Sequence, residues 1–171
     1  MIRLQIGLLS LAVLAMLLPS CSTQNVGGVT TSVKPTTTPA VSANGLQTFQ
    51  GFITSEDDFV DPVIGTDPSK DTSAMILMNA MAQSGLGLAV RESEGWKFYY
   101  FSGDLATTIF PAFNGTGAQL DAWNIVDRTQ KKDHISVKVT GWLDGRTATN
   151  TGGDADGIYW PVITVNSMSE N

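Results

Sequence analysis

Two groups of acidic residues supply oxygen ligands of the kind that calcium prefers. The first group lies between residues 56 and 71 and comprises Glu56, Asp57, Asp58, Asp61, Asp67 and Asp71. The second group is Asp154 and Asp156, just before Gly157. Neither has the D-x-[DN]-x-[DN]-G spacing of an EF-hand loop. We therefore interpret both groups as solvated loops and expect no metal site, with a calcium carrier as the alternative.

Three methionines, Met75, Met78 and Met81, follow one another at intervals of three residues. This pattern is similar to the copper(I) sites of some periplasmic proteins, and soft thioether ligands do select Cu(I). The same spacing places the three side chains beside Ile76 and Leu77 at helical intervals, where flexible hydrophobic side chains fill a core. We expect core packing here, and a copper carrier is the alternative.

Catalysis needs an acid, a base or a nucleophile that converge, and the sequence offers no recognisable set. His134 is the only histidine, and the GxSxG, HExxH and GxxxxGK[ST] motifs are absent. Because charged residues 131–133 precede it, we expect His134 at a solvated strand edge. Gly152, Gly153 and Gly157 lie in a polar stretch without the strand-to-helix context of a phosphate site. The sequence predicts a protein that is not an enzyme and has no cofactor, with an uncharacterised enzyme as the alternative.

All the candidate residues above lie within residues 45–171, and the sequence of this segment predicts a β-rich domain. Five stretches rich in aromatic and β-branched residues are bounded by turn residues, which is typical of strands. They are Thr48–Thr54, Leu86–Val90, Trp96–Ser102, Ile135–Leu143 and Ile158–Val165. Helical patterns occupy Ser73–Gln83 and Ala118–Val126, each preceded by residues suited to caps.

A strand, a hairpin, a helix and two further strands in this order resemble the OB-fold, a small Greek-key barrel. The segment Val137-Lys138-Val139-Thr140-Gly141 looks like its fourth strand, with the common glycine where the wall bends. Residues 84–88 and 95–101 look like the second and third strands of bacterial exported OB-fold domains. The resemblance implies an all-β domain, a five-stranded OB-like Greek-key barrel with one or two short helices. The helix at 73–83 and a long loop at 144–157 are insertions, and another small barrel or a sandwich is the alternative fold.

The first 21 residues resemble the signal peptide of a bacterial lipoprotein. After Arg3, the uncharged run Ile6–Leu18 has the length of a signal-peptide core and is short for a transmembrane helix. It leads to Leu18-Pro19-Ser20-Cys21, which resembles a lipobox around the only cysteine of the chain. The resemblance implies cleavage before Cys21 and acyl chains such as palmitate on that residue. An ordinary signal peptide or an uncleaved anchor is the alternative.

A lipidated Cys21 implies an anchor in a cell membrane, since each buried CH2 contributes about 0.8 kcal/mol. Ser22, where an Asp would retain a Gram-negative lipoprotein in the inner membrane, favours the outer membrane. Residues 21–44 are rich in Thr, Ser and Pro and are expected to form a disordered tether. The domain would then be periplasmic or extracellular.

The net charge of the chain limits the classes of partner that it can bind. The 171 residues carry 10 Lys and Arg against 16 Asp and Glu, and cleavage would remove Arg3. Such a chain lacks the basic residues that supply most of the binding energy to phosphate backbones, so we expect no nucleic-acid partner. The predicted function is a non-catalytic binding or structural module in the cell envelope, with a protein, a peptide or a glycan as partner.

Strand alternation predicts an aromatic contact surface outside the barrel. Alternate side chains of a strand face opposite sides, and charged Lys97 marks the outward set that includes Tyr99. The inward set is Trp96, Phe98 and Tyr100. The same rule places Trp142 and Trp160 outside, and exposed aromatic residues commonly mark binding surfaces. The alternatives are that a helix or loop covers these residues, or that a bulge at Pro161 reverses the last strand.

Overall fold

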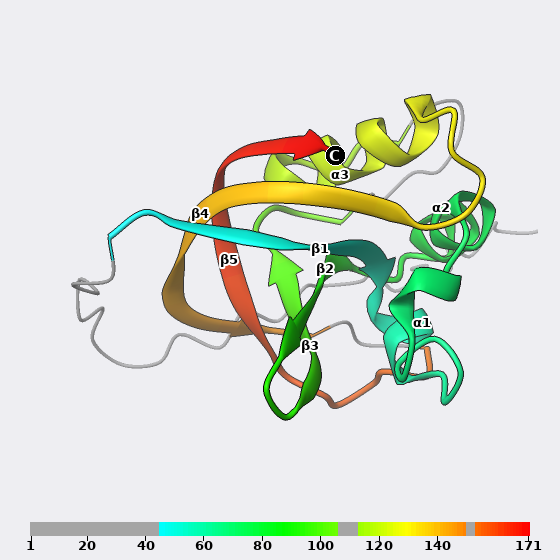
Figure 1. The fold of residues 1–171 in the computed structure, drawn as a ribbon, viewed down its shortest axis with the longest axis horizontal. Coiled ribbons are helices and arrows are strands. Elements are labelled where there is room, and N and C mark those ends of the chain that lie inside the picture. Colours follow the sequence, from blue (N-terminus) through cyan, green and yellow to red (C-terminus); the bar gives the residue numbers. More distant parts are fainter. Residues whose placement is uncertain (1–44, 106–112, 150–152) are drawn as a thin grey trace, which may run out of the picture.

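The chain folds into a closed barrel of five strands, in the order β1-β2-β3-β5-β4 (Figure 1). The computed structural model describes residues 45–105, 113–149 and 153–171. The strands are β1 (Gln47–Ser55), β2 (Leu86–Glu92), β3 (Gly95–Phe101), β4 (Ile135–Ala148) and β5 (Trp160–Glu170). The predicted OB-like five-stranded barrel is thereby confirmed. The predictions for the signal peptide, Cys21 and the tether fall outside the described residues, as does Gly152.

Four short helical segments accompany the barrel: α1 (Glu56–Val60), the 3-10 turn η1 (Pro68–Lys70), α2 (Ser73–Met81) and α3 (Gly117–Arg128). Two of them begin at a hydroxyl cap, because Ser55 accepts from the amide of Asp58 and Thr72 accepts from the amide of Met75. The predicted helices correspond to α2 and α3. Helices α1 and α2 lie at the end of β1 that is opposite to its first residue (Figure 1).

The barrel closes where β3 and β5 pair in parallel over a short stretch. Strand β1 pairs antiparallel with both β2 and β4, and β4 pairs antiparallel with β5 along most of its length. Between β3 and β5 the register has only two pairs, Tyr100 with Val162 and Phe101 with Ile163. The register of β4 on β5 shifts at Gly141, where an added Cβ would lie 2.3 Å from the carbonyl oxygen of Thr164. This agrees with the bend predicted at that glycine.

The long loop predicted from Asp144 begins later than expected. Strand β4 continues to Ala148, because Thr147 and Ala148 pair with Pro161 and Trp160 after a second register shift. The expectation of a loop from Asp144 onward is therefore wrong for its first residues. Asp144 instead accepts hydrogen bonds from Arg146 and Thr164, which hold this outer end of the β4–β5 ribbon together.

The barrel interior takes the alternate residues of each strand, and in β3 the observed parity is the reverse of the predicted one. Ile135, Val137 and Val139 of β4 are fully buried, as predicted. In β3, however, Tyr99 lies in this same interior cluster with 5% of its surface exposed, so its predicted outward position is wrong. Lys97 shares the parity of Tyr99 but sits near the open end, where its Nζ lies 5.1 Å above the Tyr99 ring. The long side chain reaches solvent from an inward-facing position.

The opposite face of β3 carries a second apolar cluster outside the barrel wall. Phe98 and Tyr100 are buried there beside Phe59 of α1 and Trp160 of β5, so the prediction that they point into the barrel is wrong. The rings of Phe98 and Trp160 are 5.0 Å apart, and Phe59 contacts both. An added Cβ at Gly87 would lie 2.3 Å from the Phe98 ring, so the glycine on β2 makes room for it.

A buried glutamine joins α3 to the barrel. Gln119 donates to the carbonyl oxygens of Leu86 and Phe101, both at 2.9 Å, and accepts from the Leu86 amide at 2.9 Å. It is fully buried. The side chain therefore provides hydrogen-bond partners for three backbone groups, at the start of β2 and at the end of β3.

Candidate binding site: an acidic cavity between α1 and α2

A cavity of about 410 Å³ opens beside the barrel where β1 runs into α1. Its walls come from α1, from the turn after it, from α2 and from the loop before β5. They are formed by Asp57, Asp58, Asp61, Val63, Ile64, Met75, Asn79, Gly153 and Asp154. Four of these side chains are carboxylates, and no lysine, arginine or histidine is among them. The cavity thus has a single sign of charge, which focuses the electric field in it.

Asp57 ties the distant loop to α1. Its Oδ1 accepts from the backbone amide of Ala155 at 2.9 Å, and its own amide donates to the hydroxyl of Ser84. Gly153 has φ of +82°, and a Cβ there would lie 2.4 Å from Asp57 Oδ2. Only glycine fits such a position without strain. The loop therefore wraps closely around the Asp57 carboxylate, which brings Asp154 to the cavity.

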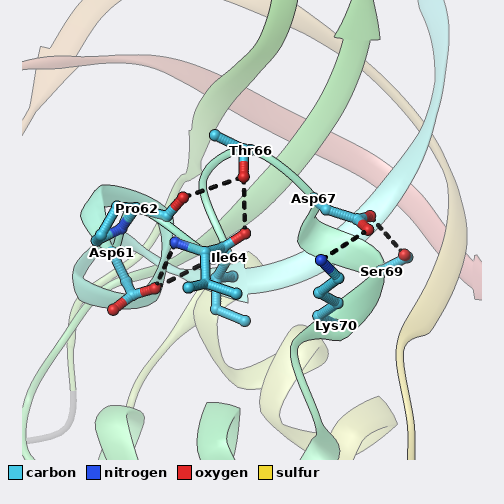
Figure 2. Close-up of polar contacts among 8 residues, drawn as sticks. Asp61, Pro62, Ile64, Thr66, Asp67, Ser69 and Lys70 are labelled. Atoms are coloured by element: carbon cyan, nitrogen blue, oxygen red, sulfur yellow. Dashed lines mark hydrogen bonds and ion pairs between the residues drawn. The ribbon is translucent and has the colours of Figure 1, made fainter.

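The turn between α1 and α2 is held by its own polar side chains (Figure 2). Asp61 Oδ1 accepts from the amides of Val63 and Ile64 at 2.8 and 3.1 Å. Thr66 donates to backbone carbonyl oxygens of the same turn, and Asp67 accepts from Ser69. These bonds fix the backbone that presents Val63 and Ile64 to the cavity.

Two carboxyl groups at the base of α1 are buried together. Asp58 is 6% exposed and Asp71 is fully buried, and the two carboxyl groups are close enough to shift the pKa of each other. Ser55 donates to Asp58 Oδ2 at 2.8 Å, and Thr54 donates to Asp71 Oδ2 at 2.6 Å. The expectation that all these acids lie in a solvated loop is therefore wrong for this pair, and also for Glu56, which is fully buried.

Burial raises the pKa of both carboxyl groups in this pair. Loss of water is the main cause, and it raises the pKa of Asp71 to about 8, with a further contribution from the charge of Asp58. The pKa of Asp58 also rises with burial, although hydrogen bonds from Ser55 and Asn79 oppose the rise. At neutral pH the buried pair therefore retains a proton that exposed carboxyl groups would have released.

One wall of the cavity is apolar. Val63 is 54% exposed, and Met75 stands beside it on α2. Met78, one turn further along α2, is 59% exposed, and Met81 is 41% exposed. The expectation that these methionines fill the core is therefore wrong for Met78 and Met81, and Met75 lines the cavity and belongs to neither core cluster. Between them, Ile76 and Ala80 take the buried face of the helix.

The three aromatic residues of the predicted contact surface do not come together. Tyr99 lies inside the barrel, and its hydroxyl donates to Glu92. Trp142 is 37% exposed on the outer face of β4, where it pairs with Thr164. Trp160 is partly buried in the second apolar cluster. Each of the three therefore has a different environment, and the predicted surface loses Tyr99 to the barrel interior.

The remaining candidates lie away from the cavity. His134 is partly exposed, with its ring 5.0 Å from that of Phe52 and its Nδ1 3.7 Å from a carboxylate oxygen of Asp133. Within the described ranges, no three His, Cys, Asp or Glu side chains are placed to hold a metal ion. In the same ranges no helix is long and apolar enough to cross a bilayer.

Comparisons with family models, with curated proteins and with solved structures found no match to this chain. Sequence reasoning missed Val63, Asn79 and Met75 as parts of one cavity with the acidic residues. One signal was present: Ser55 and Asp58 form an S-x-x-D capping pattern, which predicts a helix start there instead of a loop.

Proposed function

We propose that this protein is a lipid-anchored, non-catalytic binding module of the bacterial cell envelope, and that the acidic cavity between α1 and α2 is its binding site. The cavity is the observation that carries the proposal. Its volume of about 410 Å³ is in the range of small ligand pockets, and it combines charged and apolar walls. Its partner would be a protein, a peptide or a glycan of the envelope.

A binding role fits the site better than catalysis. Asp71, the carboxyl with the strongly raised pKa, is fully buried and does not line the cavity. Asp58 does line it, but it is 6% exposed and its Oδ2 accepts a hydrogen bond from Ser55. A general acid or base has to reach its substrate within hydrogen-bond distance. This pair instead joins β1 and α1 to the start of α2.

The anchor is tested by Cys21→Ser. We expect the wild-type chain to incorporate labelled palmitate and to sediment with membranes, and the variant to lose both properties. Membrane association of the variant, with processing unchanged, would refute the lipid anchor. The binding site is independent of this result, because it belongs to another part of the chain.

The site itself is tested by photo-crosslinking in living cells of the source organism. A photoreactive phenylalanine analogue replaces Val63, which is 54% exposed at the cavity, and in a matched control it replaces Leu46, which is 61% exposed. Leu46 precedes β1 and Val63 follows α1, so the nine residues of β1, which span roughly 30 Å, lie between the two positions together with α1. We expect an adduct from position 63 and none from position 46. Equal adducts, or none from position 63, would refute binding at the cavity.

A further inference from the structure

We propose that the acidic cavity recognises a lysine or arginine side chain that an apolar stretch of a partner polypeptide presents. This inference rests on the proposed binding function and adds the chemical class of the ligand. Three observations support it: the negative charge of the carboxylates that line the cavity, its apolar wall, and the hydrogen bonds that these carboxylates already accept.

The negative charge of the cavity is not neutralised by the basic residues that form ion pairs elsewhere. Lys70 pairs with Asp67, Lys97 with Glu92, Lys131 with Glu170 and Arg146 with Asp144. None of these bases lines the cavity. Asp154 is exposed at the rim, so its carboxylate is accessible to a ligand. A cation that enters the cavity would therefore meet the charges of Asp57, Asp61 and Asp154.

The apolar wall selects among cations. Val63 and Met75 face the cavity, and the exposed Met78 extends this surface along α2. Lysine and arginine carry their charge on an apolar stem that is buried readily against such side chains. Methionine is flexible and polarisable, and it is frequent at surfaces that bind varied peptides. The side chain of a basic residue would place its stem on this wall and its charge at the carboxylates.

A metal ion fits the same carboxylates less well. Asp61 Oδ1 already accepts from two backbone amides, and Asp57 Oδ1 accepts from the amide of Ala155. Among the described residues, no three potential ligand side chains are placed around one point. An organic cation needs no closed coordination shell and accommodates carboxylates that remain bonded to the backbone.

The test uses the full-length chain in a nonionic detergent and a rhodamine-labelled peptide, Gly-Ser-Leu-Lys-Leu-Gly-Ser, with fluorescence anisotropy as the readout. A second peptide carries norleucine in place of lysine, which keeps the stem and removes the charge. We expect the lysine peptide to bind about fivefold more tightly or better, which is the effect of an ion pair worth about 1 kcal/mol. Its binding should weaken as NaCl is raised from 50 to 500 mM, because salt screens the charges.

Two matched pairs of variants locate the site. Asp154→Asn should weaken binding of the lysine peptide about two- to fivefold, whereas Asp156→Asn, in the same loop but outside the cavity lining, should leave it unchanged. Val63→Ser should weaken the binding of both peptides, and Leu46→Ser should not.

Four results would overturn the inference. They are equal binding of the norleucine peptide, equal effects of Asp154→Asn and Asp156→Asn, no binding of either peptide, and displacement of the lysine peptide by CaCl2 at equal ionic strength. Each would leave the crosslink from position 63 as a separate result. A crosslink without preference for the lysine peptide would indicate another ligand, whereas no crosslink and no peptide binding would indicate a cavity that binds nothing.

Discussion

Replacing Asp71 by asparagine should remove most of the pH dependence of stability between pH 4 and pH 8. The pKa of this buried carboxyl group rises from 3.8 to about 8 on folding. In this window the folded state therefore holds a proton that the unfolded state has released. Stability falls as pH rises through the window, because the unfolded state binds fewer protons than the folded one.

The size of the effect follows from the same shift. One pKa unit corresponds to about 1.36 kcal/mol, so a shift of about four units corresponds to a loss of on the order of 5 kcal/mol by pH 9. An asparagine side chain keeps the hydrogen bond from Thr54, because its oxygen accepts as Asp71 Oδ2 does, and it carries no charge at either pH. Asp71→Asn should therefore match the wild type near pH 5 and exceed it at pH 9.

Thermal unfolding at pH 5 and pH 9 measures this difference. At about 3 to 5 °C per kcal/mol for a domain of this size, we expect the variant to melt at least about 10 °C above the wild type at pH 9. Asp67→Asn is the control, because a hydrogen bond from Ser69 lowers the pKa of the exposed Asp67 and it is ionised at both pH values. A variant as sensitive to alkali as the wild type would refute the raised pKa of Asp71.

Two further predictions concern the barrel. Gln119→Leu leaves three backbone groups of Leu86 and Phe101 without their partner, so it should cost about 3 kcal/mol or more in the free energy of unfolding, measured with urea. Tyr99→Ser should cost about 3 to 5 kcal/mol, as for other buried aromatic residues. Trp142→Ser should cost less, about 1 to 2 kcal/mol, because 37% of that residue remains in solvent.

Matched outcomes decide these two predictions. Gln50→Leu changes an exposed glutamine of β1 and should leave stability nearly unchanged, so an equal loss in both glutamine variants would contradict the bridging role of Gln119. Equal losses for Tyr99→Ser and Trp142→Ser would contradict the assignment of Tyr99 to the barrel interior.

The sequence predicted the barrel well because its strands carry local signals. Clusters of β-branched and aromatic residues, bounded by turn residues, identify all five strands, and their order alone indicates the OB-like topology. Side-chain direction was harder. Lys97 was interpreted as outward because it is charged, yet a barrel has open ends where a long inward side chain reaches water. The helix α1 was missed because it has only five residues.

The cavity could be predicted only in part. The acidic residues were visible, but their burial depends on Thr54 and Asn79, which meet Asp71 and Ser55 through the fold. Contacts over such distances leave no local pattern. The link between Asp57 and Ala155 spans 98 positions and depends on the geometry of Gly153. The sequence therefore suggested a solvated loop, whereas tertiary contacts bury two of its carboxyl groups, Asp58 and Asp71.

The position of β5 makes this strand decisive for folding. Its eleven residues complete the wall against both β3 and β4. A chain that stops before Trp160 would leave two strand edges without a partner, and such edges template aggregation. Because distant segments must meet before the barrel closes, folding should also be slow compared with helical domains. An interrupted chain would therefore stay open and protease-sensitive, and proteolysis would distinguish finished from unfinished molecules.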